Sequence, residues 1–208
     1  LQIPGKRILI LVGLALWPFL LRAQDPPDTT GIWFRNCHSF GKRFLYSQTV
    51  LWPTSVAGHA YVMITEQVAF RETFSWQKYH KTFTLPPVWD RDHWSWNYEA
   101  HPYMGSLSYL SYRNRRAHWL EAIAGTAINS AIYEYLIAGG TQRPSYNDLI
   151  ITPTLGSLLG ESLYQLKKAL LRDRHLTTLE KVLVTLTDPF EVLYFGFDYG
   201  KMARYRYR

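Results

Sequence analysis

Cysteine is almost absent from this sequence. Cys37 is the single thiol in 208 residues, which excludes an internal disulfide framework and a cysteine-rich metal site. The short motifs that mark common catalytic sites are missing as well: there is no H-E-x-x-H, no G-x-S-x-G and no phosphate-binding glycine loop. The sequence by itself therefore identifies no reaction, and we expect neither a metal nor a cofactor.

The N-terminal apolar run is too short for a membrane span. It extends from Ile8 to Leu21 with Pro18 inside it, whereas a spanning helix needs about 20 apolar residues. Two basic residues precede the run and a small residue, Ala23, follows it, which is the pattern of a secretory signal. We interpret residues 1–23 as a signal peptide or a retained membrane anchor, and either places the rest of the chain outside the cytoplasm.

Acidic residues are outnumbered: 16 Asp and Glu stand against 23 Lys and Arg, for a net charge of +7. Such a charge suits nucleic acid or anionic lipid equally well. Because no signature of a nucleic-acid-binding fold accompanies it, we expect anionic lipid or subunits of a membrane complex as partners, and no nucleic acid. Aromatic residues, in contrast, are abundant, with 8 Trp and 15 Tyr, and these side chains concentrate at protein interfaces and membrane belts.

The length and the hydrophobic periodicity predict one mainly α domain. We expect a compact helical domain over residues 55–186, preceded by a linker and extended segment over 24–54. An extended aromatic and basic C-terminal arm over 187–208 would follow it. The expected helices are 55–72, 102–114, 119–138, 153–172 and one from 176 to about 186, with a loop over 82–92.

Proline, glycine and capping residues set the expected helix ends. Pro102 and Pro153 suit the first helical position, and Thr152 would cap the helix that starts at Pro153. The pair Ser145-x-x-Asp148 would cap a separate short turn. Small residues predict close packing between helices, above all Gly156-x-x-x-Gly160 within the helix 153–172.

Polar side chains fall on one stripe of two of these helices. Thr126, Ser130 and Glu134 are spaced by four residues, and so are Ser157, Glu161 and Gln165. Together with an imidazole at a helix start and an acid in the connecting loop, they suggest a single internal cluster. Its catalytic candidates are His101, Glu134, Asp148 and Glu161, and its structural members also include Asn129 and Ser130.

Two interpretations of this cluster remain. Carboxylates and an imidazole suit general acid–base chemistry. Alternatively the groups satisfy one another, because burying a polar group without a partner costs roughly 2–7 kcal/mol. We favour the structural interpretation, and for His101 a role in starting and orienting a helix.

Basic and aromatic residues suggest a membrane or partner interface. One group is Arg113, Arg115 and Arg116 beside Tyr112. The other is the tail, where arginines that alternate with tyrosines would suit anionic headgroups. The tail residues of this interface are Tyr205, Arg206, Tyr207 and Arg208.

Several motifs in order resemble a known family. W-N-Y-x-x-H-P-Y-x-G-S at 96–106, Glu134, P-S-x-N-D-L-I-I-T-P at 144–153 and the G-x-x-x-G-E that ends at Glu161 resemble an uncharacterised bacterial cell-envelope family, known only as a domain of unknown function. The resemblance covers about residues 90–165, and longer members carry further sequence after the helical region. It implies export and a helical core, and it brings no catalytic assignment.

Three functions are consistent with these features. The first is a non-catalytic, membrane-associated envelope protein, on the periplasmic side, that serves as an accessory or scaffolding subunit of a membrane complex. The second is an envelope enzyme that acts on lipid or glycan through the His/Glu/Asp cluster. The third is a lipid-binding module.

Overall fold

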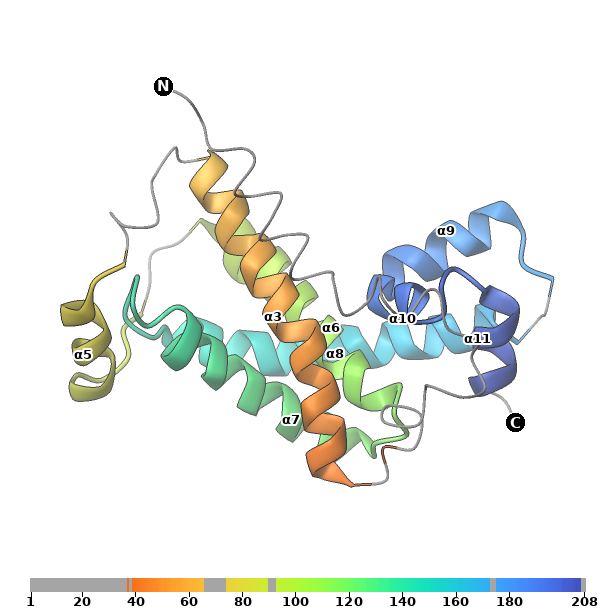
Figure 1. The fold of residues 1–208 in the computed structure, drawn as a ribbon, viewed down its shortest axis with the longest axis horizontal. Coiled ribbons are helices and arrows are strands. Elements are labelled where there is room, and N and C mark those ends of the chain that lie inside the picture. Colours follow the sequence, from red (N-terminus) through yellow and green to blue (C-terminus); the bar gives the residue numbers. More distant parts are fainter. Residues whose placement is uncertain (1–36, 38, 66–73, 90–92, 173–174, 207–208) are drawn as a thin grey trace.

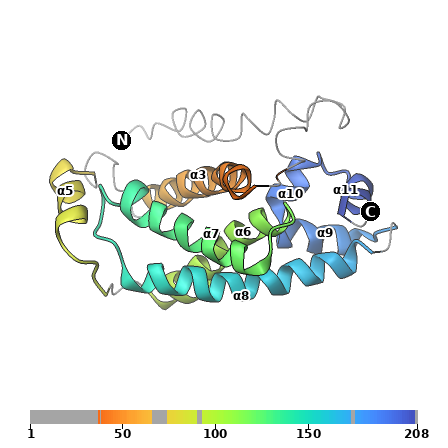
Figure 2. The same ribbon diagram turned by 90° about the horizontal axis from the view of Figure 1, so that it is seen from below.

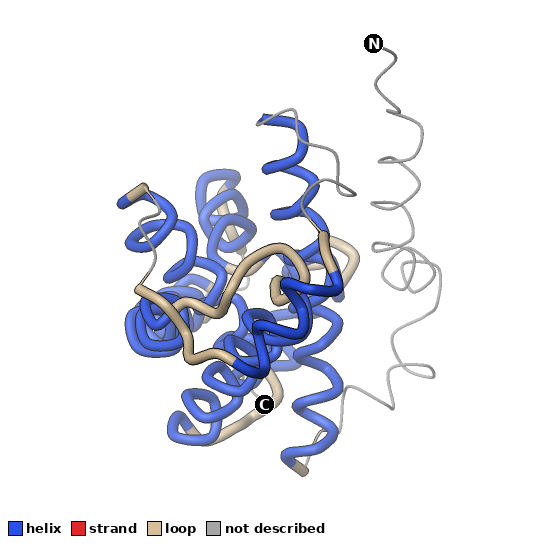
Figure 3. Tube along the Cα trace, turned by 90° about the vertical axis from the view of Figure 1, so that its left-hand side faces the viewer, coloured by secondary structure: helices blue, strands red, loops and turns tan. Residues whose placement is uncertain are grey.

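A computed structural model describes residues 37, 39–65, 74–89, 93–172 and 175–206. Regular structure within these ranges is helical, apart from one isolated parallel bridge between Val88 and Ser145 (Figure 3). The helices are α3 (Phe40–Thr65), α5 (Trp76–Thr84), α6 (His101–Arg113), α7 (Trp119–Ile132), α8 (Tyr146–Leu170), α9 (Thr178–Thr187), α10 (Pro189–Tyr194) and α11 (Tyr199–Arg206), with π-helical turns η1 (Trp96–Ala100) and η2 (Tyr133–Ile137). The prediction of a mainly α, compact helical fold is confirmed.

Helix α8 packs against α6, α7 and α9. Both α6 and α7 pack against it and also contact α3, so that they lie between the layers of α3 and α8 (Figure 2). Helix α5 stands at one end of the assembly, and α9, α10 and α11 form a group at the other end (Figure 1). The two ends of α8 therefore lie in different surroundings.

The predicted close packing of small residues is confirmed where α6 crosses α8. A Cβ atom placed on Gly105 would lie 2.2 Å from the carbonyl oxygen of Thr152, and one placed on Gly156 would lie 2.6 Å from the Cα of Gly105. A Cβ on Gly160 would lie 2.7 Å from the Tyr109 ring. The two backbones thus touch, and no larger residue fits at the crossing without a shift of one helix.

The start of α8 differs from the prediction. The helix begins at Tyr146, and its N-cap is Ser145, whose hydroxyl accepts the backbone N–H of Asp148 at 3.2 Å. Thr152 is therefore wrong as a cap, and the predicted short turn is the first turn of α8 itself. Pro153 lies buried inside the helix, where a proline removes one backbone donor but α8 continues through it.

The chain is also more helical than expected at both flanks. Helix α3 starts at Phe40. Tyr46 and Val50, buried at the i, i+4 spacing of one helix face, stabilise this first half of the helix. The extended segment predicted up to residue 54 is therefore wrong over 40–54. The predicted helix from 176 to about 186 is confirmed as α9, which starts with a capping box between Thr177 and Glu180.

The predicted extended C-terminal arm is wrong as well, because two helices occupy it. Asp188 accepts the N–H of Glu191 at 3.1 Å to start α10, and Asp198 accepts the N–H of Lys201 at 2.8 Å in the first turn of α11. Apolar side chains of these helices pack into a buried core with α8 and α9: Leu171, Val184, Val192, Met202 and Ala203. Their burial explains why helices form where the sequence suggested an arm.

Helices long and apolar enough to cross a membrane are not found among the described residues. The predicted signal or anchor over residues 1–23 lies outside them.

Candidate functional site

His101 and Asp148 meet at the start of α8. His101 follows the π-helical turn η1 and opens α6, and its Nε2 lies 3.4 Å from the Oδ1 of Asp148. The Asp148 carboxylate is buried, whereas the imidazole remains partly exposed. π-Helical turns inside longer helices often occur at functional sites. Here the turn positions the imidazole over the first turn of α8.

Two residues of the α7–η2 segment reach the same place. The Ser130 hydroxyl donates to the backbone carbonyl of Asp148 at 3.0 Å. The Glu134 carboxylate, fully buried, accepts the backbone N–H of Ser145 at 2.8 Å. A carboxylate at a helix N-terminus is favoured by the helix dipole. We name His101, Ser130, Glu134, Asp148 and Ser145 the α8-start cluster.

Asn129 lies outside this cluster and links three helices instead. Its amide nitrogen donates to the hydroxyls of Ser108 at 2.8 Å and Ser47 at 3.1 Å. Its amide oxygen accepts from Gln48 at 2.9 Å. These contacts join α3, α6 and α7 at a buried point, away from the cluster in which the sequence placed Asn129.

Glu161 is also separate from the α8-start cluster. It lies thirteen residues beyond Asp148 on the same helix, which corresponds to about 20 Å. Its carboxylate accepts from the Arg113 guanidinium at 2.8 and 3.1 Å and from the Tyr109 hydroxyl at 2.6 Å. Burial raises the pKa of Glu161, but hydrogen bonds from Arg113, Tyr109 and Gln165 outweigh it and hold the pKa below its usual value. The prediction of one cluster with four catalytic candidates is therefore wrong for Glu161.

A buried network of charges, which the sequence did not reveal, surrounds the C-terminal part of α8. Lys167 Nζ donates to Asp188 Oδ2 and, at 2.7 Å, to the side-chain oxygen of Asn114. Asn114 in turn donates to Asp188 at 2.5 Å. All three side chains are buried. We name the full set the charge network: Tyr46, Asn114, Arg115, Lys167, Asp188 and Glu191.

Arg115 and Glu191 complete this network. The guanidinium lies 3.2 Å from a Glu191 oxygen and stacks 3.9 Å from the centre of the Tyr46 ring. The Tyr46 hydroxyl donates to Glu191 at 3.2 Å, and burial raises its pKa well above the usual value. The network thus contains two cations and two anions, and it ties α3, α6 and α8 to the α9–α10 junction.

The predicted interface of three arginines does not form a surface. Arg113 pairs with Glu161 and lies 4.4 Å from the Tyr164 ring centre, and Arg115 is fully buried. Only Arg116 of the three is exposed. An unpaired arginine at Arg115 would be costly to bury, which is why the chain folds it against Glu191. The side chains of Tyr205 and Arg206, together with Tyr207 and Arg208, lie outside the described residues.

The geometry limits what these groups can do. Within the described part of the chain, His, Cys, Asp and Glu do not gather in threes that could hold a metal ion. An open hollow of about 600 Å³ is lined by the segments that lead into α9 and α11 and by the first turns of these helices, among them Lys181, Phe197 and Tyr199. It lies at the other end of α8 from the His101–Asp148 pair. The pair itself has the composition of an acid–base unit, and the remaining candidate groups hold helices together.

Comparison with known proteins identifies the family. No curated protein and no solved structure matches the chain. The family described as Domain of unknown function (DUF3943) matches residues 86–190, a range that contains η1, α6, α7, η2, α8 and α9. The α8-start cluster and most of the charge network fall inside it. The chain therefore belongs to this family of domains of unknown function.

Proposed function

We propose that the protein is a non-catalytic, membrane-associated protein of the bacterial cell envelope that serves as an accessory or scaffolding subunit of a larger membrane complex. The observation that carries this proposal is an exposed apolar stripe on α9. Leu179 and Leu186 are 68% and 65% exposed, and Val182 and Leu183 lie between them. The spacing i, i+3, i+4, i+7 places all four on one helix face.

The opposite face of α9 is already occupied. Val184 and Thr187 are buried, and Val184 belongs to the core that α8, α10 and α11 share. Helix α9 thus packs one apolar face against α8, α10 and α11 and exposes a second apolar face to solvent. Contiguous exposed apolar surface of this kind marks sites of protein–protein or membrane interaction. Aliphatic side chains at helical spacing suit the groove or helix of a protein partner.

Internal contacts of the polar groups support a non-catalytic role. Glu134 holds the start of α8, Glu161 holds Arg113, and the charge network joins four segments of the chain. Membrane association rests on the N-terminal signal or anchor pattern, on the excess of Trp and Tyr, and on the resemblance of the HPYxGS, PSxNDLIxTP and GxxxGE motifs to envelope proteins.

Site-specific crosslinking in the native membrane tests this proposal. A photoreactive amino acid at Leu183 should give one discrete heavier product, whereas the same residue at exposed Lys168 should not. The double variant Leu179→Gln/Leu186→Gln should remove the protein from the detergent-extracted complex, because it makes the stripe polar. Leu158→Gln, at an equally exposed leucine of α8, is the matched control and should stay assembled. A monomer in every case would contradict the proposal.

The His101–Asp148 pair favours a second candidate function, an envelope enzyme that acts on lipid or glycan. An imidazole beside a buried carboxylate is a suitable general base. On this alternative, His101→Asn abolishes the cellular function while fold and assembly persist. On the scaffold proposal, the same variant retains function in proportion to the folded protein that remains.

A further inference from the structure

Helix α5 is held rigidly at the end of the molecule. The N–H of Ser75 donates to the carbonyl of Gly140 at 2.8 Å, and the Thr82 hydroxyl donates to the carbonyl of Gly139 at 2.8 Å. A Cβ on Gly140 would lie 2.2 Å from the Phe74 ring, so the start of α5 is closely packed against the Gly139–Gly140 turn. The helix therefore presents its outer surface in a fixed orientation, at the far left in Figure 1.

An aromatic stripe runs along α5 beside its contact with the η2 segment: the half-buried Tyr79 donates to the carbonyl of Leu136 at 3.5 Å, and the Phe83 ring lies 6.0 Å from the Tyr135 ring. Trp76, Tyr79 and Phe83 follow at spacings of three and four residues, with ring centroids 6.0 Å and 5.5 Å apart. Trp76 is 76% exposed and Phe83 is 57% exposed. An indole and a phenol combine an apolar body with a polar edge, which is why Trp and Tyr accumulate at membrane–water boundaries.

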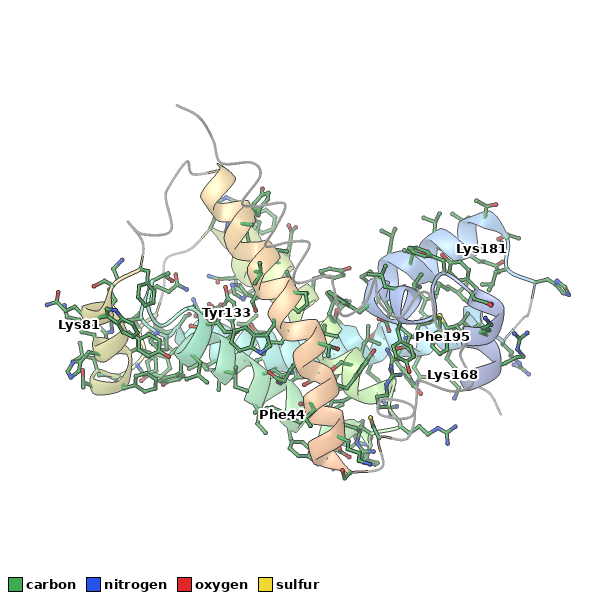
Figure 4. All side chains as sticks on the ribbon, viewed as in Figure 1. Phe44, Lys81, Tyr133, Lys168, Lys181 and Phe195 are labelled. Atoms are coloured by element: carbon green, nitrogen blue, oxygen red, sulfur yellow. The ribbon has the colours of Figure 1, made fainter. Side chains whose placement is uncertain are left out.

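The remaining surface of α5 is cationic. Lys78 and Lys81 are exposed, and the helix contains no acidic residue. At about 100° per residue the two lysines lie on the side of the helix away from the aromatic stripe. Figure 4 shows Lys81 extended outward at the edge of the molecule. Lysine stems are long enough to reach a charged surface that the stripe contacts.

We propose that α5 is an interfacial anchor that binds an anionic phospholipid surface. The exposed rings of Trp76 and Phe83 enter the boundary between headgroups and acyl chains, and Lys78 and Lys81 interact with lipid phosphates. This combination is typical of helices that lie in the membrane interface. Protein interfaces, in contrast, are depleted in lysine, which assigns α5 to lipid and the aliphatic α9 stripe to protein. The inference deepens the proposed function, on which its membrane setting rests.

Vesicle co-sedimentation of the full 208-residue chain tests the anchor. Vesicles of phosphatidylglycerol and phosphatidylethanolamine are compared with vesicles of phosphatidylcholine alone. Lys78→Gln/Lys81→Gln should weaken binding to the anionic vesicles by about tenfold, because each lysine near an anionic surface contributes to the binding free energy. Trp76→Gln/Phe83→Gln should weaken binding to both kinds of vesicle. The matched controls, Lys168→Gln/Arg172→Gln and Leu179→Gln/Leu186→Gln, should bind like the wild type.

The salt dependence provides a second measurement. Binding of the wild type should weaken between 0.1 and 0.5 M salt, and the lysine variant should lose most of this dependence. Circular dichroism should show unchanged helix content in both α5 variants, because all four side chains are exposed. Equal binding to neutral vesicles, or α5 variants that bind like the controls, would overturn the inference. Loss of the α9 variant alone from the detergent-extracted complex would still support the scaffold, so the two proposals fail independently.

Discussion

The two ends of α8 both bury polar groups, but these groups are paired in different ways. At its start, the α8-start cluster uses single contacts to the backbone and one imidazole–carboxylate approach of 3.4 Å. At its far end, nineteen residues and about 28 Å away, Lys167 contacts an anion and an amide at once. The first end orients a helix, whereas the second joins α8 to the α9–α10 junction.

Burial makes the far end of α8 more sensitive to substitution than its start. Charges removed from water are stable only when paired, and removal of one partner leaves the other charge buried and alone. In the charge network the pairs are Lys167 with Asp188 and Arg115 with Glu191. At the start of α8, His101 remains partly exposed, so loss of its contact allows water to compensate.

The largest effect is therefore expected from Lys167→Met. It should lower the free energy of unfolding by about 3–5 kcal/mol, because Asp188 loses its ammonium partner in a buried site. The adjacent Lys168→Met is the matched control, since Lys168 is exposed, and it should change stability by less than about 0.5 kcal/mol. Urea denaturation of both variants measures the difference, and equal losses would mean that Lys167 is hydrated.

The crossing of α6 and α8 connects the two ends, and its glycines give the next effect. Gly156→Ala should cost about 1–3 kcal/mol, because the new methyl group would overlap the backbone of Gly105. Gly58→Ala in α3 meets nothing within 4 Å and should stabilise the protein by up to about 1 kcal/mol through helix propensity.

Opposite signs for these two variants would show that the stability loss in Gly156→Ala comes from the close helix crossing. The replacement of a glycine in a helix would not by itself explain it. Thermal unfolding followed by circular dichroism measures both. If Gly156→Ala also stabilised the protein, the helices at the crossing would be free to separate, and the two ends of α8 would then behave independently.

The two partners at the start of α8 could be anticipated in part, because their signals are local. Pro102 places His101 at the start of α6, and Ser145-x-x-Asp148 is a capping pattern. That pattern starts α8 itself and not the separate turn expected before Pro153, because α8 continues through the proline. Glu161 was wrongly added, because a stripe along one helix does not bring residues thirteen positions apart together. The small-residue crossing was likewise visible as Gly156-x-x-x-Gly160.

The charge network could not be anticipated because it depends on tertiary packing. Two adjacent lysines at 167 and 168 give no indication of which one turns inward; the docking of α9 and α10 decides that. Asp188 before Pro189 is a helix-start signal, but its second role as the partner of Lys167 has no local pattern. The helices α10 and α11 were missed for the same reason, since their burial against Leu171 comes from distant residues.

A smaller effect is expected from His101→Asn. Loss of the contact with Asp148 should cost about 1 kcal/mol, in the range of a single polar interaction. If this variant lowered the free energy of unfolding as much as Lys167→Met, the start of α8 would be as sensitive to substitution as its far end. Chemical denaturation gives the stability, and complementation of a deletion strain reports function in parallel. Lost complementation with full stability would support the enzyme alternative.

The smallest effect concerns Glu161, which lies between the two ends. Its pKa is lowered in the folded protein, so its contribution to stability is present above the unfolded pKa of about 4.3 and is lost as the pH falls through the folded value. The contribution should stay below about 1 kcal/mol, because the pair with Arg113 is partly exposed.

Glu161→Gln should therefore be less stable than the wild type at neutral pH, and the difference should disappear in acid. Tyr109→Phe removes one of the donors to this carboxylate and should reduce the pH dependence without abolishing it, because Arg113 remains. Unfolding midpoints between pH 3 and pH 7 measure both variants. If the difference between Glu161→Gln and the wild type were constant over that range, the Arg113–Glu161 pair would stabilise the protein by geometry alone, and the charge on α8 would matter only in the buried network around Lys167.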